Sequence, residues 1–412
     1  MNATSTADIT IIGAGPIGSY AAWMLSRRGF SVTILEEHPE TGRPEQCAGL
    51  VNRTMFDLPE LDRLLDNVRL NDIIGADIYS PAGNSLALRA GKVKAVSMDR
   101  ARFDKQLFRN AANAGAETML STKAIDVERK EDDRFKVHYK GLSGEGAIDT
   151  RLLIGCDGAS SSIRKHLSID KPLSTLPGVA FQVEIENGKV PRDLVAVFTG
   201  KETAKGFFAW AVPAGTETSM RFGLAAEDGL SLKNGWERLQ QDKRLFEWLG
   251  FDDGRRGLTG IISFNLGTLP IGSPRTIISG NALILGDSAG MAKPTSGGGI
   301  YPGLMAVNDL INSIEESGDI SQETLRMFHN SWLSGYGKEL SRSRFFRKLI
   351  SQVEDGEVED VVKRLSDPEL LKIINCEGDI DHPLRLALLL IRKEPSLLKM
   401  IPRFLPYVRN MV

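Results

Sequence analysis

Three glycines near the start of the chain have the spacing of a phosphate-binding turn. Gly13, Gly15 and Gly18 are spaced G-x-G-x-x-G and follow a short apolar run that predicts a buried parallel strand at 9–12. Such glycines permit a tight turn, close approach of a pyrophosphate, and close packing of helix on strand. The N-terminus of the predicted helix would offer the phosphates free backbone N–H groups and the positive end of the helix dipole. We expect these glycines, with Pro16 between them, to bind a dinucleotide.

An acid at the end of the second predicted strand supports this interpretation. Glu36 follows the apolar run 32–35 and can accept hydrogen bonds from both ribose hydroxyls. Its charge would repel a 2′-phosphate, which disfavours NADP here. A lone glycine motif is weak evidence, whereas strand, helix, strand and acid in this order are strong evidence.

A second turn follows the predicted strand 147–154. Asp157 could face a ribityl chain or position Arg164, and Gly158 allows the backbone to approach a ligand. Serines after it are good helix N-caps. Taken alone, this is more often an ordinary strand-to-helix turn.

A third turn, Gly286-Asp287, leads into a glycine-rich loop. Gly297, Gly298 and Gly299 precede a helix predicted at 304–315. Bare N–H groups at a helix N-terminus would stabilise negative charge on an electron-rich ring. Three successive glycines at a helix entrance are hard to explain by packing alone.

A cation stands at the start of another predicted helix. Arg100 precedes 101–114, where Phe103, Leu107 and Ala111 recur at a spacing of four. The guanidinium could reach phosphate or ribose, and the alternative is an ordinary surface arginine.

The composition is that of an ordinary globular protein. The 412 residues are 42% hydrophobic and 25% charged, which predicts two or three domains with sizeable cores. A net charge of −2 gives no reason to expect nucleic-acid binding. The three cysteines lack metal-site spacing, and neither a signal peptide nor an apolar run of transmembrane length is found. We therefore expect a cytoplasmic protein without a metal.

The periodicity changes to two between 179 and 226, which predicts an antiparallel sheet of about four strands. Phe207, Phe208 and Trp210 give this sheet an aromatic character suited to an apolar substrate, although any one of them is more often core. The segment 75–88 would be an excursion into another sheet, and a helix is expected at 235–249.

The tail from about 330 predicts helices that mix apolar and basic residues. From Asp381 onward it has six Lys or Arg against two Asp or Glu. Such a segment can lie on an anionic membrane, at the inner face in a cytoplasmic protein. A cap packed back onto the protein is at least as good an explanation.

Together the three turns resemble those of the flavoprotein fold typified by para-hydroxybenzoate hydroxylase. Arg100, in Arg-x-x-Phe-Asp-x-x-Leu, fits the same resemblance. It implies bound FAD and an α/β (α+β) fold with a Rossmann-like FAD-binding domain, a β-sheet substrate domain and a C-terminal helical region. The implied boundaries are 1–75, 96–175 and 270–330 for the discontinuous FAD-binding domain, 76–95 and 176–269 for the sheet, and 331–412 for the helices.

Within that fold the chain resembles the geranylgeranyl reductase family over nearly its whole length. The shared marks are Pro44-x-x-Cys47-x-Gly49, Pro294-x-x-Gly-Gly-Gly299, and Phe208-x-Trp210-x-x-Pro213 followed by Gly223-x-Ala225. The family usually has Tyr at 208, Phe at 212, Gly at 225 and a Cys-Gly-Glu-Gly loop. These departures leave the expected fold unchanged. They bear instead on which substrate is used.

The resemblance implies hydride transfer from N5 of reduced FAD to an isolated alkene of an isoprenoid chain, with a proton added to the other carbon. Archaeal members of the family saturate lipid isoprenoids in this way. Cys47 is then the nearest candidate for proton donor or flavin-side contact, and the alternative is an inert small residue. The implied substrate pocket is lined by Phe208, Trp210, Pro213 and Gly223.

The resemblance implies a larger set of cofactor contacts. They are Gly13, Gly15, Pro16, Gly18, Glu36, Glu37, Arg43, Cys47, Ala48, Arg100, Ala124, Asp157, Gly158, Gly286, Asp287, Pro294, Gly297, Gly298, Gly299 and Ile300.

Two competing functions remain open from the sequence. An aromatic-hydroxylase-type monooxygenase on the same fold would need groups that ionise a phenol, and the sheet at 207–225 has few. A membrane-associated flavin scaffold would need a lipid-binding tail and an unreactive flavin. The expected partners of a reductase are an isoprenoid lipid and an external electron donor. Because no second dinucleotide motif is found, that donor can be ferredoxin, a reduced flavin or NAD(P)H.

Overall fold

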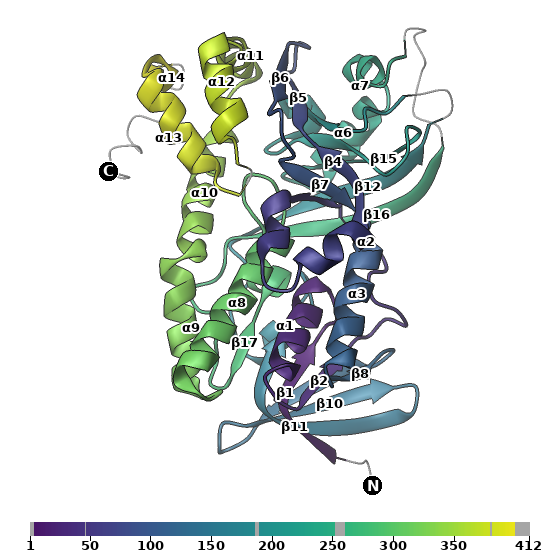
Figure 1. Cartoon of the computed structure of the whole chain (residues 1–412), viewed down its shortest axis with the longest axis vertical. Coiled ribbons are helices and arrows are strands. Elements are labelled where there is room, and N and C mark those ends of the chain that lie inside the picture. The colour runs from purple at the N-terminus through teal and green to yellow at the C-terminus, as the bar shows by residue number, and fades with distance from the viewer. Residues whose placement is uncertain (1–3, 46, 186–188, 252–259, 380, 400–412) are drawn as a thin grey trace. The chain divides into compact units, whose positions relative to one another are not determined.

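The computed structural model describes residues 4–45, 47–185, 189–251, 260–379 and 381–399 (Figure 1). The chain forms two compact units, each assembled from three segments. The first unit contains Met1–Glu45, Arg100–Thr175 and Leu269–Ser341, and the second contains Gln46–Asp99, Leu176–Thr268 and Arg342–Val412. Both units mix helices with sheets, which confirms the predicted fold class.

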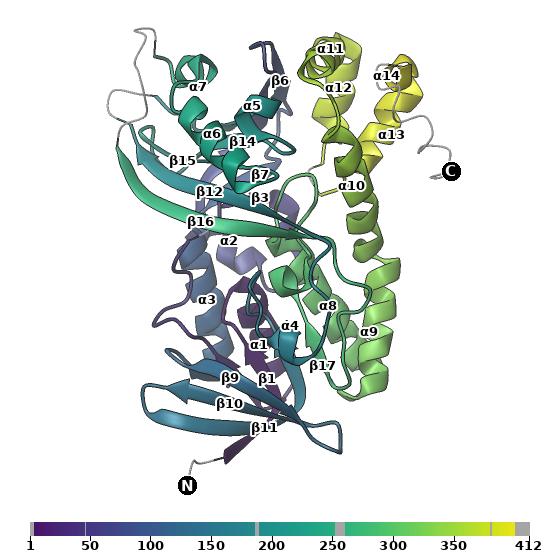
Figure 2. The same cartoon turned by 180° about the vertical axis from the view of Figure 1, so that it is seen from behind.

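The first unit is built on one sheet in the order β8-β2-β1-β11-β10-β9, with β17 also paired to β11. Strand β1 pairs parallel with both β2 and β11, whereas β9, β10 and β11 are antiparallel neighbours. Figure 2 shows this antiparallel part of the sheet. The predicted meander is therefore continuous with the parallel sheet, because β11 belongs to both. The strands are β1 Thr4–Ile12, β2 Val32–Leu35, β8 Glu117–Met119, β9 Lys123–Arg129, β10 Phe135–Gly141, β11 Gly144–Gly155 and β17 Ala282–Ile284.

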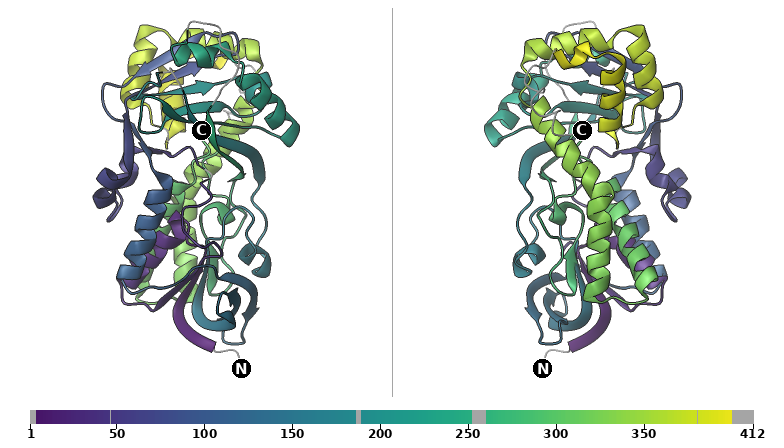
Figure 3. Two further views of the ribbon diagram at one scale, coloured as in Figure 1. Left: turned by 90° about the vertical axis from the view of Figure 1, so that its right-hand side faces the viewer. Right: turned by 90° about the vertical axis from the view of Figure 1, so that its left-hand side faces the viewer.

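Helix α1 (Pro16–Ser26) is the most enclosed helix of the first unit among the described residues. All its residues after Pro16 are buried, because it packs against α3 (Arg100–Asn113), β2 and α8 (Ile300–Ser317). Helices α1 and α3 lie side by side in Figure 1. Figure 3 shows α8 beside α9 (Gln322–Ser334), the two green helices of this unit. Short elements complete the unit: α4 Ile163–His166 and the 3-10 turn η3 Gly286–Ala289.

The second unit has a seven-stranded sheet in the order β16-β12-β15-β14-β13-β5-β6, and a three-stranded sheet β3-β7-β4. The prediction of about four strands between 179 and 226 is confirmed by β12, β13, β14 and β15. The whole sheet is larger, because the excursion β5–β6 joins it and because β16 was missed. The strands are β3 Leu50–Asn52, β4 Arg69–Ile73, β5 Gly75–Tyr79, β6 Ser85–Arg89, β7 Ala95–Met98, β12 Ser174–Glu184, β13 Leu194–Phe198, β14 Ala209–Pro213, β15 Ser219–Ala225 and β16 Ile261–Ile271. The short helical elements are η1 Arg53–Asp57, η2 Asp62–Leu64, α2 Leu65–Val68 and α5 Lys201–Ala204.

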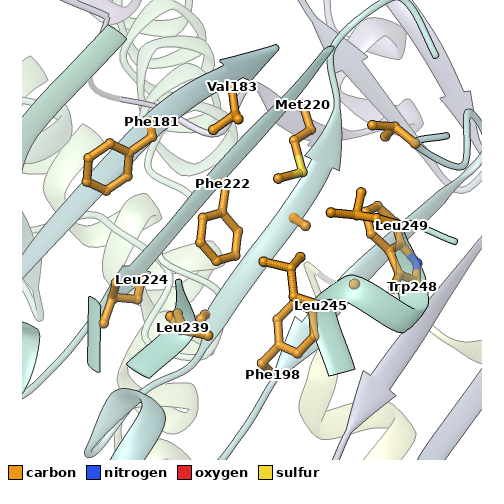
Figure 4. Close-up of a cluster of buried hydrophobic side chains, with 14 of the residues drawn as sticks. Phe181, Val183, Phe198, Met220, Phe222, Leu224, Leu239, Leu245, Trp248 and Leu249 are labelled. Carbon is orange, nitrogen blue, oxygen red and sulfur yellow. The ribbon is translucent and has the colours of Figure 1, made fainter. Parts of the chain in front are cut away.

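Two helices, α6 (Gly229–Leu239) and α7 (Lys243–Trp248), replace the single helix predicted at 235–249. The break occurs because Asp242 caps α7, its side chain accepting the backbone N–H of Arg244. Both helices cover one face of the large sheet. Figure 4 shows the resulting core, in which Phe181 and Phe222 of the sheet lie near Leu239 and Leu245 of the helices.

The tail is helical, as predicted. Its helices are α10 Tyr336–Ile350, α11 Asp355–Leu365, α12 Pro368–Glu377, α13 Pro383–Lys393 and α14 Ser396–Lys399. Residues 400–412 of the basic segment lie outside the described residues. Among the helices that are described, none has the length and apolar character needed to cross a bilayer.

Candidate functional site

The carboxyl ends of four parallel strands meet at one edge of the first unit's sheet. Strands β1, β2, β11 and β17 run in the same direction, and predicted site residues follow each of them. Ligands of open α/β sheets bind outside this edge. The edge therefore gathers turns that are up to 274 residues apart in the chain, as from Gly13 to Asp287, into one place.

The first two turns are in contact. A Cβ added to Gly13 would overlap the carbonyl oxygen of Cys156, the residue just before Asp157. The third turn lies against the same helix, because the Cβ position of Gly286 is 3.1 Å from Cγ1 of Ile17 in α1. The backbone N–H of Leu285 also donates to the carbonyl of Gly155 at 2.9 Å. The three turns therefore converge within one unit.

The glycines of the first turn serve different needs. Gly13 has φ +98°, which an L side chain rarely adopts, and a Cβ on Gly18 would overlap the carbonyl oxygen of Gly13. Gly15 is different: its φ is −62° and nothing lies within 4 Å of its Cβ position. The space beside Gly15, at the N-terminus of α1, is thus open, and a side chain would fill it.

Glu36 is tied to the glycine turn. The residue is 9% exposed, and its Oε2 accepts the backbone N–H of Ala14 at 2.8 Å. Its Oε1 accepts the backbone N–H of His38 at 3.0 Å and lies 2.6 Å from Nδ1 of the same residue. The carboxylate is therefore fixed in place at the end of β2, and its contact with ribose stays a prediction.

Three other predicted contacts lie around the end of β2 or in the loop after it. Glu37 forms an exposed ion pair with Lys123 at 2.8 Å. Ala124 is buried on β9, whose preceding residue Thr122 donates its backbone N–H to the carbonyl of Glu36. Arg43 is exposed.

Asp157 has a structural partner that the sequence interpretation did not name. Its carboxylate accepts hydrogen bonds from the Oγ of Ser161 and from the backbone N–H groups of Ser162 and Ile163, at 2.6–3.0 Å. The side chain thus caps α4, whereas the two alternatives expected from the sequence were a ribityl chain and Arg164. Gly158, at φ +75°, has nothing within 4 Å of its Cβ position and so leaves the backbone accessible.

Arg100 is not the surface residue of the alternative interpretation. Its side chain is 15% exposed and pairs with Asp104 at 2.7 Å. It also lies close enough to Asp287 to act on it electrostatically. Burial raises the pKa of Asp287 to about 6, and the charge of Arg100 opposes that rise.

The glycine-rich loop enters α8 directly. This helix begins at Ile300, four residues before the predicted start, so Gly299 is its N-cap. An Oδ1 of Asp287 lies 2.6 Å from the Cβ position of Gly299, which leaves no room for a side chain. Just before the glycines, Pro294 is buried in the loop.

The remaining predicted residues belong to the second unit. Cys47 is half-buried, and its Sγ accepts the backbone N–H of Gly49 at 3.3 Å. Ala48 and Trp210 pack against the same small apolar cluster. The indole Cζ2 lies 2.6 Å from the Cβ position of Gly223, so this glycine lets the ring lie on β15.

The aromatic side chains of the predicted pocket also contact one another. The rings of Phe208 and Trp210 meet edge to face at 6.1 Å, and Phe207 stacks on Phe208 at 4.3 Å. Pro213 is buried at the end of β14. The second unit thus contains the predicted pocket residues, on or directly before β14 and β15, and also the cysteine loop, which precedes β3 of the separate three-stranded sheet.

The sequence interpretation missed two buried cations. Lys293, in the loop before the three glycines, is 6% exposed. Arg221, in the fully buried strand β15, donates from Nη1 to the carbonyl of Met98 at 2.8 Å. The sequence signal that could have identified them is a single charged residue inside an otherwise uncharged strand or glycine-rich loop.

The first unit fits FAD. Open backbone at Gly15 and Gly158, two helix N-termini and the fixed carboxylate of Glu36 would take up a pyrophosphate, a ribityl chain and a ribose. The turns at Asp287 and Gly299 add a half-buried acid beside a helix N-terminus.

Comparisons with known proteins agree with this geometry. Residues 6–317 match the FAD binding domain family. The chain is 28% identical over 402 residues to the digeranylgeranylglycerophospholipid reductase of Methanocaldococcus jannaschii, covering 95% of this chain and 96% of the relative. It is 29% identical over 405 residues to digeranylgeranylglycerophospholipid reductase 2 of Methanothermobacter thermautotrophicus, covering 96% and 98%.

Solved structures share the fold. A geranylgeranyl bacteriochlorophyll reductase-like protein of Thermoplasma acidophilum superposes with a TM-score of 0.80 at 20% identity, over 97% of this chain and all of that one. The p-nitrophenol 4-monooxygenase of Pseudomonas putida superposes with a TM-score of 0.72 at 14% identity, over 92% and 98%. The family match spans three quarters of the sequence and includes all three converging turns, and the chain therefore belongs to the FAD binding domain family.

Proposed function

We propose that the protein is an FAD-dependent reductase that saturates C=C bonds in geranylgeranyl or related isoprenoid chains of membrane lipids or their precursors. The observation that carries the proposal is the similarity, over at least 95% of both chains, to proteins named digeranylgeranylglycerophospholipid reductase. Reduced FAD supplies the hydride when it is bound.

The first unit would hold the cofactor. The turn at Gly13–Gly18 and the N-terminus of α1 would bind its pyrophosphate, with Glu36 at the ribose. Arg100 would neutralise phosphate or ribose oxygens from the start of α3. The N–H groups of Gly298 and Gly299 would face the flavin ring.

The second unit would hold the isoprenoid chain. Phe208 and Trp210 offer apolar rings, and the buried strand β14 around them carries no charged side chain. An isolated alkene has no group that a charged residue could polarise. The protein would therefore act by positioning the double bond and excluding water.

Cys47 would donate the proton that completes the saturation. Its half-buried thiol is oriented by the N–H of Gly49. In Cys47→Ala, alkene reduction should fall at least tenfold while FAD stays bound, and Cys47→Ser should retain a part of the activity because a hydroxyl also carries a proton. Full activity in Cys47→Ala would remove this role, and Cys376→Ala, at an exposed cysteine, is the matched control.

Mass spectrometry of lipids tests the proposed activity. The protein would be coexpressed with a pathway that makes unsaturated archaeal lipids, and lipid masses should rise in steps of two. No such gain, together with rapid substrate-stimulated NADPH oxidation in air, would favour a monooxygenase instead. Ferredoxin, reduced flavin and NAD(P)H supplied separately would identify the electron donor.

The tail would serve mainly as a cap. Glu359 of α11 accepts hydrogen bonds from Ser80, Ala82 and Asn84, in the turn between β5 and β6. Lys94 donates to the carbonyls of Cys376 and Gly378 at the C-terminal end of α12. Peripheral membrane contact would then fall to α13, which has basic residues in its last turn and leaves Leu388 62% exposed.

A further inference from the structure

Lys293 is a buried cation in the loop that precedes α8. The residue is 6% exposed, and it is followed by Pro294 and by five uncharged residues, 295–299. Lysine is almost never buried to this degree without a specific reason. The pyrophosphate contacts proposed above do not use it.

The backbone holds Lys293 in one position. Its N–H donates to the carbonyl of Gly298 at 3.1 Å, and its carbonyl accepts the N–H of Gly297 at 2.8 Å. These two hydrogen bonds close a ring of six residues, and the proline that follows fixes the next φ. The point from which the side chain starts is therefore well defined.

The side chain folds back over the glycine turn. Its Cε and Nζ lie 3.0 Å and 3.4 Å from the position that a Cβ on Gly298 would occupy. A residue larger than glycine would displace the end of the lysine. Glycine at position 298 thus leaves room for the lysine ammonium as well as for the backbone of the turn.

The charges around this turn include one acid that ionises at a higher pH than an ordinary aspartate. The Asp287 carboxylate lies beside Gly299, and burial raises its pKa to about 6. Arg100 is paired with Asp104. The N-terminus of α8 adds a partial positive charge next to the ammonium.

We propose that Lys293 sets the reduction potential of the bound flavin, by placing a full positive charge at the turn that faces the electron-rich edge of the ring. Two electrons and one proton convert oxidised flavin into its anionic reduced form. A desolvated cation beside the new negative charge favours that form over the oxidised one. The inference rests on FAD being held at this turn, as in the proposed function.

The test compares three purified holoproteins with wild type. Lys293→Met removes the charge and keeps much of the length, Lys293→Arg keeps the charge, and Lys171→Met removes an exposed charge of the same unit. The readouts are FAD content, the midpoint potential against a reference dye, and the dissociation constant of sulfite, which adds reversibly to flavins that stabilise negative charge.

In Lys293→Met we expect sulfite to bind at least tenfold more weakly and the two-electron equilibrium to shift at least tenfold towards oxidised flavin, which is about 30 mV. Lys293→Arg and Lys171→Met should stay within threefold of wild type. Unchanged sulfite affinity and potential in an FAD-loaded Lys293→Met would overturn the proposal and leave the reductase intact. An equal shift in Lys171→Met would also overturn it.

Loss of FAD from the variant and loss of FAD from the wild-type protein would have different meanings. If Lys293→Met does not retain FAD, Lys293→Gln carries the same test with a polar side chain of similar length. Wild-type protein that binds no FAD would refute the cofactor site itself, and with it both proposals.

Discussion

The Oε2 of Glu36 accepts the backbone N–H of Ala14 at 2.8 Å, which joins the end of β2 to the turn between β1 and α1. The acid expected to recognise ribose is therefore also part of the frame that shapes the phosphate-binding turn. Removing the Glu36 side chain should therefore weaken ribose recognition and also disturb the phosphate-binding turn.

Replacing Glu36 with Ala should weaken FAD binding by at least tenfold. The change removes the expected ribose acceptor and frees an N–H of the glycine turn, and a hydrogen bond to a charged group contributes roughly 1.5–3 kcal/mol. Flavin fluorescence during titration of the flavin-free protein would give the dissociation constant. Glu40→Ala, at an exposed acid paired with Lys105, is the control and should bind as wild type does.

Alanine at Gly18 and at Gly15 should have opposite consequences. A Cβ at Gly18 would overlap the carbonyl of Gly13, so Gly18→Ala should lower the free energy of unfolding by about 1–3 kcal/mol. Gly15→Ala meets no protein atom and has an ordinary φ, so it should fold normally and lose FAD affinity. Urea unfolding and FAD titration of both variants separate these effects. Equal stability of the two variants would contradict the packing argument.

Asp287 should make stability depend on pH in the acid range. Its folded pKa is about 6, whereas an unfolded aspartate titrates near 4. Between these values the folded state binds more protons, so this group's contribution to stability falls as pH rises. Asp287→Asn should therefore stabilise flavin-free protein at pH 7 by about 1–2 kcal/mol.

The pH dependence supplies the check on Asp287. The stability difference between Asp287→Asn and wild type should be small below pH 4 and should appear between pH 4 and 6, as followed by urea unfolding. Asp170→Asn, an exposed acid of the same unit, should show no such window. A constant difference at every pH would mean that the substitution acts through packing.

Glu359 should hold α11 on the turn between β5 and β6. Partial burial opposes its ionisation, but hydrogen bonds from Ala82, Asn84 and Ser80 lower its pKa overall. Because the folded pKa is lowered, its stabilisation is present at neutral pH and is lost as pH falls through that lowered pKa. Glu359→Gln should cost about 1–2 kcal/mol at pH 7 in urea unfolding.

Two comparisons complete the test of the cap. Asp360→Asn, at the exposed neighbouring acid, should leave stability unchanged. Deleting residues after 380 removes α13 and should abolish binding to anionic vesicles if that helix makes the membrane contact, while α11 stays in place. Retained vesicle binding by the shortened protein would locate the contact elsewhere.

The sequence by itself determined the local elements around the first turn. The strand β2, the helix α1 and the positions of Gly13, Gly18 and Glu36 follow from residue type and spacing over 30 residues, because the whole pattern of strand, turn, helix, strand and acid is contained in that segment. The fold class and the family resemblance also followed from such motifs.

The pairing and packing of segments far apart in the chain could be seen only in the tertiary structure. That β16 joins the large sheet, and that Asp242 splits the predicted helix into α6 and α7, depends on pairing and capping that periodicity does not encode. Likewise the burial of Lys293 and the raised pKa of Asp287 depend on how the folded chain packs around these two side chains. Desolvation is a property of the packed chain, and no residue carries it in the sequence.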